Sequence, residues 1–501
     1  MGRLALTVLA LIAVVSRGGV RSQGVVPYGE ALRPQVHFTP AANFMNDPNG
    51  LVYFEGEYHL FYQHNPFGDR WGHMSWGHAV SPDLLHWTHL PVALAEESGV
   101  MIFSGSAVVD RDDTSGLCGG RPCLVAIYTG HSKELQTQNL AYSRDRGRTW
   151  TKFAGNPVVD VGLKDFRDPK VFWYEPAKRW VMVTVLADQR KVRLFGSRDL
   201  KRWEVLSDFG PAGAIGGVWE CPDLFPLAVE GEAGSERWVL DVDLNPGGAA
   251  GGSGGQYFVG RFDGTAFVAE QTSDRVLWSD FGKDFYATIS FSDIPPADGR
   301  RIWMAWMSNW QYANDEPTSP WRGALSVPRE LALRRTPDGL RLAQRPVREL
   351  ERLRSGDTPV VVSSRTSLPA AAEFQLTVSL GSAAAGIRLS NAAGESVEIG
   401  AGGSPSEVFV DRRRSRATPF HAEYPGRHAG PIRDARGVVE LRVIVDTSTV
   451  EVFAGNGETT ISDRLFPTEP FTHVEVVNAP QLRGTAAMWP LASVWRRAGR
   501  P

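Results

Sequence analysis

Three acidic residues stand in local sequences suited to chemistry: Asp47 in MNDPNG, Asp168 in DFRDPKVFW and Glu220 in GVWECPDLF. Carboxylates that are brought together repel each other, so at least one must take up a proton or be held by a cation or a hydrogen-bond donor. Cleavage of a glycosidic bond uses such a set, because one acid protonates the leaving oxygen while another carboxylate attacks the anomeric carbon or activates water. The apolar neighbours of Glu220 favour its protonated form, as a general acid requires.

Each acid also has a purely structural interpretation. Asp47 lies among turn-forming residues, and in isolation it would be a turn cap. Asp168 precedes Pro169, so it could end a strand, with Arg167 as its ion-pair partner on the surface. The positions of the acids relative to the repeated elements of the chain decide between these interpretations.

A repeated turn defines those elements. A turn containing Asp and followed by an aromatic residue recurs at residues 81–87, 143–150, 197–203 and 261–267. Each copy follows a short β-rich stretch, so its Asp and Ser are expected to cap a hairpin turn and its ring to pack behind the turn. The interval of roughly 55 to 65 residues suits a four-stranded sheet with its loops, and it predicts radial repetition of sheets, as in a β-propeller.

The repeat also predicts the domains of an all-β chain. About five intervals fit between residues 35 and 340, which indicates a five-bladed β-propeller, with a set of unrelated β-hairpins as the alternative. PRELALRR and QRPVRELERLRS then predict a closing strand and a short helical connector. Alternating strands with few tryptophans follow, as in a β-sandwich. We expect a propeller at residues 30–342, a connector at 343–359 and a β-sandwich at 360–498.

The same interval relates the three acids. Asp47 and Asp168 lie about two intervals apart, and Asp168 and Glu220 about one, so all three fall at the same stage of their blades. Residues at one stage of successive blades converge on the propeller axis. We therefore expect the acids to share one pocket, with polar neighbours Asn46, Gln63, Ser104, Arg167 and Lys283.

The segments NDPNG, FRDP and WECPDLF, in this order and spacing, resemble the three signature segments of glycoside hydrolase family 32, the invertases, inulinases and levanases that cleave β-fructofuranosyl bonds. The resemblance continues through FYQHNP, WGHAVSPDLLHW, FSGS, WMSNWQYA, SPWRGALSVPREL and RVIVDTSTVEVFAGNGE, over nearly the whole mature chain. It implies a five-bladed propeller joined to a β-sandwich, the same architecture that the repeat predicts.

The resemblance implies a role for each matching residue. Asp47 would be the nucleophile, Glu220 the general acid/base, and Asp168 the stabiliser of the cation-like transition state, with Arg167 helping to hold Asp168 ionised. Further residues match positions that contact the fructose ring or, for the last, an aromatic wall at the mouth: Asn46, Gln63, Trp71, Phe103, Ser104 and Trp310.

One stretch departs from the family pattern. WGHMSWGH has His73 and Ser75 where the family usually has WGNMHWGH. This change would alter hydrogen bonding beside the pocket.

The amino-acid composition limits the kinds of partner that the protein can bind. The chain has 53 Lys and Arg against 56 Asp and Glu, so no basic field would attract nucleic acid or an anionic membrane. Its 16 tryptophans suit the apolar faces of sugars, and we expect a small or polymeric carbohydrate as partner. The histidines follow no ligand spacing and NPGGAAGGSGGQ lacks the ending of a phosphate loop, so we expect no metal and no cofactor. The oligomeric state stays open.

The N-terminus predicts an export signal at residues 1–22. Arg3 precedes an apolar run at residues 4–15, and small residues precede a cut after Ser22. The run is too short to span a bilayer, so we expect a secreted protein, extracellular or periplasmic. Cys118 and Cys123 could close a small loop in an oxidising compartment, which would leave Cys221 unpaired.

These features and the resemblance together imply a retaining exo-β-fructosidase that releases terminal β-D-fructofuranosyl units from inulin or levan, and also from sucrose. DLNPGGAAGGSGGQYFVGRFDG, GKDFYA and SNWQYA resemble the exo-inulinase and levanase branch, which places polymers ahead of sucrose. A sucrose-specific invertase, a fructosyltransferase, a non-catalytic carbohydrate-binding propeller and a sialidase are the alternatives. The preference between β-2,1 and β-2,6 linkages stays open.

Overall fold

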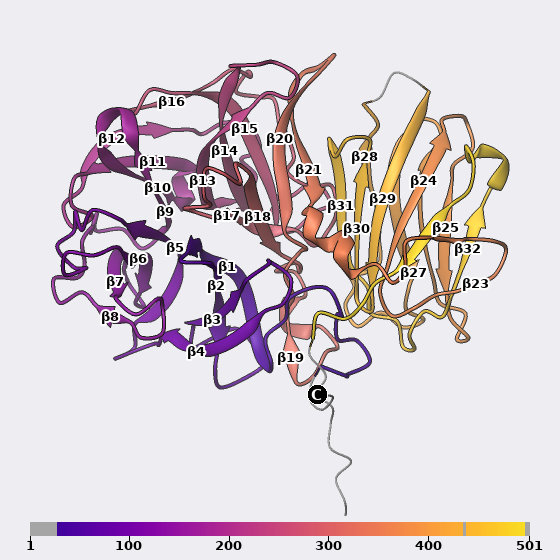
Figure 1. Cartoon of the computed structure of the whole chain (residues 1–501), viewed down its shortest axis with the longest axis horizontal. Coiled ribbons are helices and arrows are strands. Elements are labelled where there is room, and N and C mark those ends of the chain that lie inside the picture. Colours follow the sequence, from indigo (N-terminus) through magenta and orange to yellow (C-terminus); the bar gives the residue numbers. More distant parts are fainter. Residues whose placement is uncertain (1–27, 434–436, 496–501) are drawn as a thin grey trace, which may run out of the picture.

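The computed structural model describes residues 28–433 and 437–495, and in them the chain is almost entirely β-structure (Figure 1). The predicted export signal at residues 1–22 lies outside the described residues. Helix in this part is confined to short 3-10 helices, η1 (Glu175–Ala177), η2 (Ala187–Gln189), η3 (Ala313–Asp315), η4 (Arg348–Leu353) and η5 (Ala479–Gln481). Within these described ranges, no helix has the length and apolar character needed to cross a membrane.

Five sheets of four or five strands follow one another along residues 43–346 of the described chain. The first three have the orders β19-β1-β2-β3-β4, β5-β6-β7-β8 and β12-β11-β10-β9. Their strands are β1 (Asn43–Phe54), β2 (Glu57–Asn65), β3 (Ser75–Ser81), β4 (Thr88–Leu94), β19 (Trp321–Arg322), β5 (Met101–Asp110), β6 (Cys123–His131), β7 (Gln136–Ser143), β8 (Thr151–Lys152), β9 (Phe166–Tyr174), β10 (Arg179–Leu186), β11 (Lys191–Ser197) and β12 (Glu204–Phe209).

The fourth and fifth sheets have the orders β13-β14-β15-β16 and β17-β18-β20-β21. Their strands are β13 (Val218–Ala228), β14 (Glu236–Asn245), β15 (Gly254–Phe262), β16 (Phe267–Ala269), β17 (Tyr286–Ser290), β18 (Arg301–Trp306), β20 (Arg329–Thr336) and β21 (Gly339–Pro346). The first strands of the five sheets form a closed ring, because β1 contacts β5, β5 contacts β9, β9 contacts β13, β13 contacts β17 and β17 contacts β1. The ring brings the first strands toward one axis.

The repeated turn has the structure that its sequence predicts. Asp83 Oδ1 accepts the backbone N–H groups of Leu85 and His86 at 3.1 and 2.9 Å. The equivalent aspartates accept backbone N–H groups in the same way at Asp145, Asp199 and Asp263. These aspartates cap turns and lie outside the pocket that the three acids line.

The C-terminal part consists of two six-stranded sheets that enclose one apolar core. It lies beside the ring of sheets (Figure 1). One sheet contains β22 (Val360–Val361), β33 (Ala487–Pro490), β24 (Ala372–Ser379), β29 (Val438–Asp446), β30 (Thr449–Ala454) and β31 (Thr459–Arg464). The other contains β23 (Thr366–Ser367), β32 (His473–Val477), β25 (Ala385–Ser390), β26 (Ser396–Gly402), β27 (Glu407–Arg414) and β28 (Arg427–Pro431).

Buried charged residues join the two parts. The two ring nitrogens of His37 each lie 2.9 Å from a carboxylate oxygen, one of Asp446 and one of Glu451. Arg329 Nε donates to Glu451 at 2.9 Å, and all four side chains are buried. Burial lowers the pKa of His37, but the two carboxylates outweigh this and raise it to about 9. The junction therefore holds an imidazolium at neutral pH.

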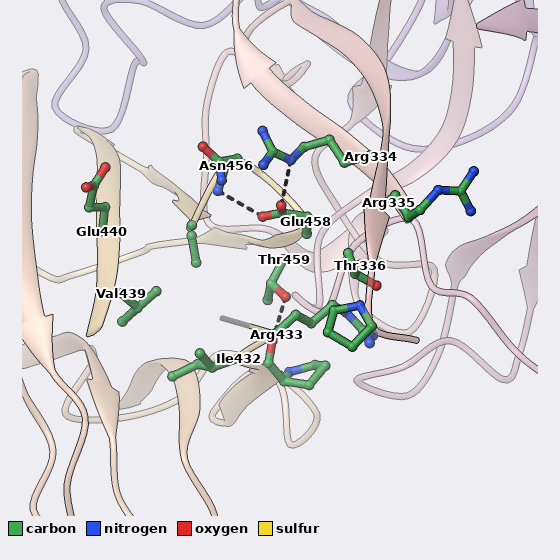
Figure 2. Close-up of a pocket in the computed structure, with 14 residues that line it drawn as sticks. Arg334, Arg335, Thr336, Ile432, Arg433, Val439, Glu440, Asn456, Glu458 and Thr459 are labelled. Atoms are coloured by element: carbon green, nitrogen blue, oxygen red, sulfur yellow. Dashed lines mark hydrogen bonds and ion pairs between the residues drawn. The ribbon is translucent and has the colours of Figure 1, made fainter. Parts of the chain in front are cut away.

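A cavity of about 490 Å³ lies at the same junction, between β20 and the sandwich strands (Figure 2). The three arginines that line it are paired. Arg334 Nε lies 2.9 Å from Glu458 Oε1, Arg335 pairs with Glu232, and Arg433 pairs with Asp338. Thr459 Oγ1 donates to a backbone carbonyl at 2.6 Å. The three acids singled out in the sequence lie elsewhere.

The structure resolves the pairing of the cysteines. Cys118, in the loop between β5 and β6, forms a disulfide with Cys123, the first residue of β6. Cys221 is a free, half-buried thiol. The disulfide therefore closes the small loop that the sequence suggested as a possibility.

Candidate active site

The three acids occupy equivalent places in the ring of first strands. Asp47 lies in β1, Asp168 in β9 and Glu220 in β13, each within the first half of its strand. β5 contributes Ser104 at the same stage, and β17 contributes Tyr286. Each of the five sheets therefore directs at least one polar side chain into the pocket described below.

A shift of strand register accompanies each of these residues. The shifts fall in segments 45–48, 102–105, 167–170, 220–223 and 286–289, one for each first strand. Such bulges re-aim side chains and are common beside functional sites. Asp168 and Cys221 adopt φ values of 64° and 47°, a left-handed conformation that is unusual for residues other than glycine. The local backbone is thus specialised where the acids lie.

The first strands enclose a pocket of about 360 Å³. Ten of the eleven residues that the sequence singled out for this site line it, namely Asn46, Asp47, Gln63, Trp71, Phe103, Ser104, Arg167, Asp168, Glu220 and Trp310. Asn245, Tyr286 and Asn314 complete the lining. The structure therefore brings together residues that are spread over more than half of the chain.

Asp47 is held by two donors. Ser104 Oγ donates to its Oδ2 at 2.6 Å, and Asn46 Nδ2 donates to its Oδ1 at 2.8 Å. Burial raises the pKa of Asp47 to about 6; the two donors lower it and the charge of Glu220 raises it further. Both oxygens are therefore oriented by neighbours while the carboxylate remains able to react.

Asp168 lies deeper in the pocket. Its Oδ2 accepts the backbone N–H of Cys221 at 3.0 Å, and its own N–H donates to Thr129 Oγ1 at 3.0 Å. Burial raises the pKa of Asp168 to about 7, although Arg167 opposes the shift. The Cys221 thiol lies 3.7 Å from Asp168 and 3.9 Å from Asp47, so it packs between the two carboxylates.

Glu220 contacts a cation and a phenol. Arg167 Nε lies 3.1 Å from Glu220 Oε1 but 4.0 Å from Asp168 Oδ2, so the arginine expected to serve Asp168 is closer to Glu220. The hydroxyl of Tyr286 donates to Glu220 Oε2. Burial raises the pKa of that phenol well above its usual range, and the charge of Glu220 adds to the shift. Glu220 is therefore positioned by donors on both oxygens.

Aromatic rings form the mouth of the pocket. Trp71 is 41% exposed and meets Phe103 edge to face at 6.1 Å. Trp310 stacks on Phe44 with the ring centroids 6.3 Å apart. Gln63 is fixed by a 3.0 Å hydrogen bond from its Nε2 to a backbone carbonyl. These rings offer apolar surface around a polar floor, which suits a sugar.

The two residues that depart from the family pattern lie beside the pocket and outside its lining. His73 is exposed, and its Nδ1 lies 2.8 Å from Glu96. Ser75 Oγ accepts the backbone N–H of Glu96 at 2.9 Å. His73 and Ser75, the two residues that differ from the family pattern, therefore both contact Glu96.

The sequence interpretation missed three lining residues and misplaced one. Tyr286 follows Lys283 by three positions in GKDFYA, the segment that the repeat places at the correct stage. Lys283 does not line the pocket; its Nζ donates to the carbonyl of Ala250 at 3.0 Å. Asn245 and Asn314 gave no signal in the sequence beyond the neighbouring family motifs.

The site has the groups that acid–base and nucleophilic chemistry require. Two carboxyl groups have raised pKa values, and a third contacts a guanidinium and a phenol donor. Carboxyl groups in such different surroundings can divide the roles of acid and nucleophile. The pocket is also small enough to surround one sugar ring.

Comparison with known proteins agrees with this geometry. Residues 37–346 match the glycosyl hydrolases family 32 N-terminal domain, and residues 341–495 match the glycosyl hydrolases family 32 C terminal. A levanase from Bacillus subtilis is 48% identical over 490 residues, which are 93% of this chain and 72% of that protein. An extracellular exo-inulinase from Aspergillus ficuum is 38% identical over 500 residues, 90% of this chain and 92% of that protein.

A solved structure resembles most of the chain. The crystal structure of exo-inulinase from Aspergillus awamori superimposes with a TM-score of 0.88 at 36% identity, covering 93% of this chain and 100% of that one. The residues that match the two family models include the five sheets, the two six-stranded sheets and the segments that hold the three acids. The chain therefore belongs to glycosyl hydrolase family 32.

Proposed function

We propose that this protein is a secreted retaining glycoside hydrolase that releases terminal β-D-fructofuranosyl units from the fructans inulin and levan, and also from sucrose. The observation that carries the proposal is the meeting of Asp47, Asp168 and Glu220 in one pocket. The similarity to a levanase and to exo-inulinases supports the substrate class. The exo-inulinases are named extracellular, which supports the location.

In this proposal Asp47 attacks the anomeric carbon of the fructosyl unit, and Glu220 protonates the leaving oxygen. Asp47 is oriented for attack by Ser104 and Asn46, which hold one carboxylate oxygen each. Water then resolves the covalent fructosyl–enzyme intermediate as Glu220 accepts its proton. The sugar leaves with its original anomeric configuration, because it has undergone two displacements.

Asp168 and the donors on Glu220 assist these steps. Asp168 would accept hydrogen bonds from the fructose hydroxyls and stabilise positive charge on the ring in the transition state. Arg167 and Tyr286 hold the anionic form of Glu220 after it has given up its proton. No step needs a metal or a cofactor.

The shape of the pocket supports attack on chain ends. Beneath it, between Ser104 and Asp168, lies a space of only about 20 Å³. Such a space holds about one water molecule, so a sugar chain cannot pass through the floor. The pocket therefore accepts a terminal unit, while the aromatic mouth can contact the next units of the chain.

We also propose the architecture that supports the site. The five sheets are the blades of a five-bladed propeller that begins near residue 30. Its last strand, β21, ends at Pro346, four residues beyond the predicted boundary at 342; a connector to residue 359 and a β-sandwich from residue 360 follow. The ring of contacts among the first strands and the even division into sheets support this assignment.

The proposal is tested by incubating purified protein with inulin, levan and sucrose and measuring free fructose. Wild-type protein should release fructose from all three substrates. Glu220→Gln should lower kcat by roughly 10²- to 10⁴-fold, the usual contribution of a general acid. It should recover much of its rate on a fructosyl substrate whose leaving group needs no proton.

Two results would contradict the proposal. A folded Glu220→Gln variant with a near-normal rate on sucrose would remove Glu220 from its role. Accumulation of longer oligomers in place of free fructose at high sucrose would show that a sugar, and not water, resolves the intermediate.

A further inference from the structure

A second cavity opens at the opposite end of the ring of sheets. Residues that follow the site residues by several positions in β5, β9 and β13 line this other mouth. This cavity has a volume of about 640 Å³ and is lined by the distal parts of β5, β9 and β13, with residues of β14 and β18. Its volume falls within the range of ligand pockets.

The two pockets are separate. Lys170 follows Asp168 by two residues in β9 and lines both the second cavity and the narrow space of about 20 Å³ below the acids. The Lys170 ammonium donates to the carbonyl of Ser290 and lies 3.6 Å from Asp223 Oδ2, so it is fixed in the passage. A ligand in the second cavity would therefore leave the active-site pocket free.

Aromatic rings form the walls of this cavity. Phe172, Trp173 and Tyr174 are consecutive at the end of β9, and Trp238 reaches the same cavity from β14. All four rings are half-buried, so part of each remains open to a ligand. The indole N–H of Trp173 donates to Glu175 at 2.6 Å, which fixes the ring. Fixed, partly open rings can stack on the apolar faces of sugars.

The polar groups of the cavity suit a neutral ligand with many hydroxyls. Arg301 uses one nitrogen to donate to a backbone carbonyl at 3.2 Å, and its guanidinium has further N–H donors. At the rim, Asp112, Glu175 and Glu236 are exposed carboxylates that can accept hydrogen bonds from hydroxyls. These acids would repel an anion. Arg111 also lines the cavity and pairs with Asp293 at 3.0 Å, so rings, arginines and carboxylates occur together here as they do in the active-site pocket.

We propose that this cavity is a second carbohydrate site, which binds a segment of fructan chain while the active-site pocket holds a chain end. The inference rests on the proposed function, because a fructan is the polymer that the enzyme would meet. Its volume exceeds that of the active-site pocket, so it has room for more than one sugar unit.

The consequence is a difference between polymer and small substrates. A polymer held at the second site remains near the enzyme between cleavage events, which raises the effective concentration of its chain ends. Sucrose is a single small molecule that cannot occupy both sites at once, so the second site does not raise its effective concentration at the active-site pocket. The second site should therefore lower KM for inulin and leave KM for sucrose unchanged.

The kinetic test uses Trp173→Ala and Glu236→Ala, with Glu204→Ala as the matched control. Glu204 is also an exposed glutamate at a strand, but it lies outside the cavity. Both cavity variants should raise KM for inulin, Trp173→Ala by roughly tenfold, with kcat and the sucrose constants unchanged. Glu204→Ala should match the wild type. An unchanged ratio of inulin to sucrose efficiency in both cavity variants would overturn the proposal.

A binding measurement tests the same site without turnover. Calorimetric titration of Glu220→Gln with a short inulin-type oligosaccharide should show two sites, and addition of Glu236→Ala should remove or weaken one of them. A single site in Glu220→Gln would overturn the proposal. This failure is distinct from failure of the proposed function, in which wild-type protein would release no fructose from sucrose or inulin.

Discussion

At the scale of single residues, the protonation of Asp47 is set by opposing contacts. Burial and the charge of Glu220 raise its pKa, and hydrogen bonds from Ser104 and Asn46 lower it. A nucleophile must be ionised to attack, so these two donors keep Asp47 reactive near pH 6 and above. Because the acids interact, the acid limb of a pH profile belongs to the cluster and not to one residue.

Ser104→Ala should shift the acid limb of the pH profile to higher pH. Loss of the hydroxyl removes a donor that favours the ionised carboxylate, so the pKa of Asp47 rises and the acid limb of kcat/KM moves to higher pH. Activity at pH 5 should therefore fall more than activity at pH 7. The measurement is a pH profile of sucrose hydrolysis from pH 4 to 8. A uniform loss at every pH would indicate that Ser104 contributes only to substrate contact.

The residues of the site were largely predictable from the sequence, because each acid stands in a distinctive motif at a fixed interval. Tyr286 was missed for a physical reason. The repeat identifies GKDFYA as the correct segment, but the register shift at 286–289 decides which of its side chains enters the pocket, and a bulge leaves no clear sign in the sequence. The preference of Arg167 for Glu220 also depends on distances that no motif encodes.

At the scale of elements, β13 and β14 place acids directly opposite each other. Glu220 pairs with Asp243, and Asp223 pairs with Asp241. Like charges at opposed positions destabilise a sheet, and burial raises the pKa of Asp241 and Asp243 well above their usual range. Burial therefore favours the protonated forms of these two residues in the folded protein.

Asp241→Asn should consequently stabilise the protein. The pKa of Asp241 is raised in the folded state, so folding must take up a proton above the ordinary pKa, and this cost grows as pH rises. The neutral amide avoids the cost. Thermal unfolding should show a higher Tm for the variant at pH 8, with the gain shrinking toward pH 4.

Asp223→Asn provides the matched control for that prediction. Asp223 lies 3.6 Å from the ammonium of Lys170, so its loss leaves a buried cation without its carboxylate and should lower Tm. Equal effects of the two substitutions would show that the pairing of charges in this sheet does not govern its stability.

The elements themselves were predictable where the sequence repeats. The turns at Asp83, Asp145, Asp199 and Asp263 gave the sheet spacing because their capping contacts are local. β19 was not predictable. It has two residues and pairs in parallel with β1, so its partner lies far away in the sequence.

At the scale of the whole molecule, buried charges join the ring of sheets to the sandwich. His37 is held between Asp446 and Glu451, with Thr449 Oγ1 3.1 Å from its Nδ1. The sequence did not predict this contact. Asp446, Thr449 and Glu451 lie in the segment RVIVDTSTVEVFAGNGE, but a motif does not show that they meet His37, which most of the chain separates from them. Because the two carboxylates favour the protonated form of His37, the stability of the junction depends on pH.

His37→Gln should remove that sensitivity. The folded pKa of about 9 lies above the ordinary value of 6.5, so the stability from His37 is complete below pH 6.5 and is lost as pH rises through 9. The contribution near neutral pH is on the order of 3 kcal/mol. Denaturant unfolding should show a large difference between wild type and variant at pH 6 that narrows by pH 10. A difference independent of pH would mean that the imidazole is uncharged at the junction.

The central claim is that Asp47 forms a covalent bond to the fructosyl unit in a pocket shared with Asp168 and Glu220. Its most direct test is to react Glu220→Gln with a fructosyl fluoride, whose leaving group needs no proton, and to map the labelled peptide by mass spectrometry. The claim predicts one added fructosyl unit on the carboxyl group of Asp47, absent from Asp47→Asn. A label on another residue, or fluoride release by a folded Asp47→Asn variant at the same rate, would contradict it.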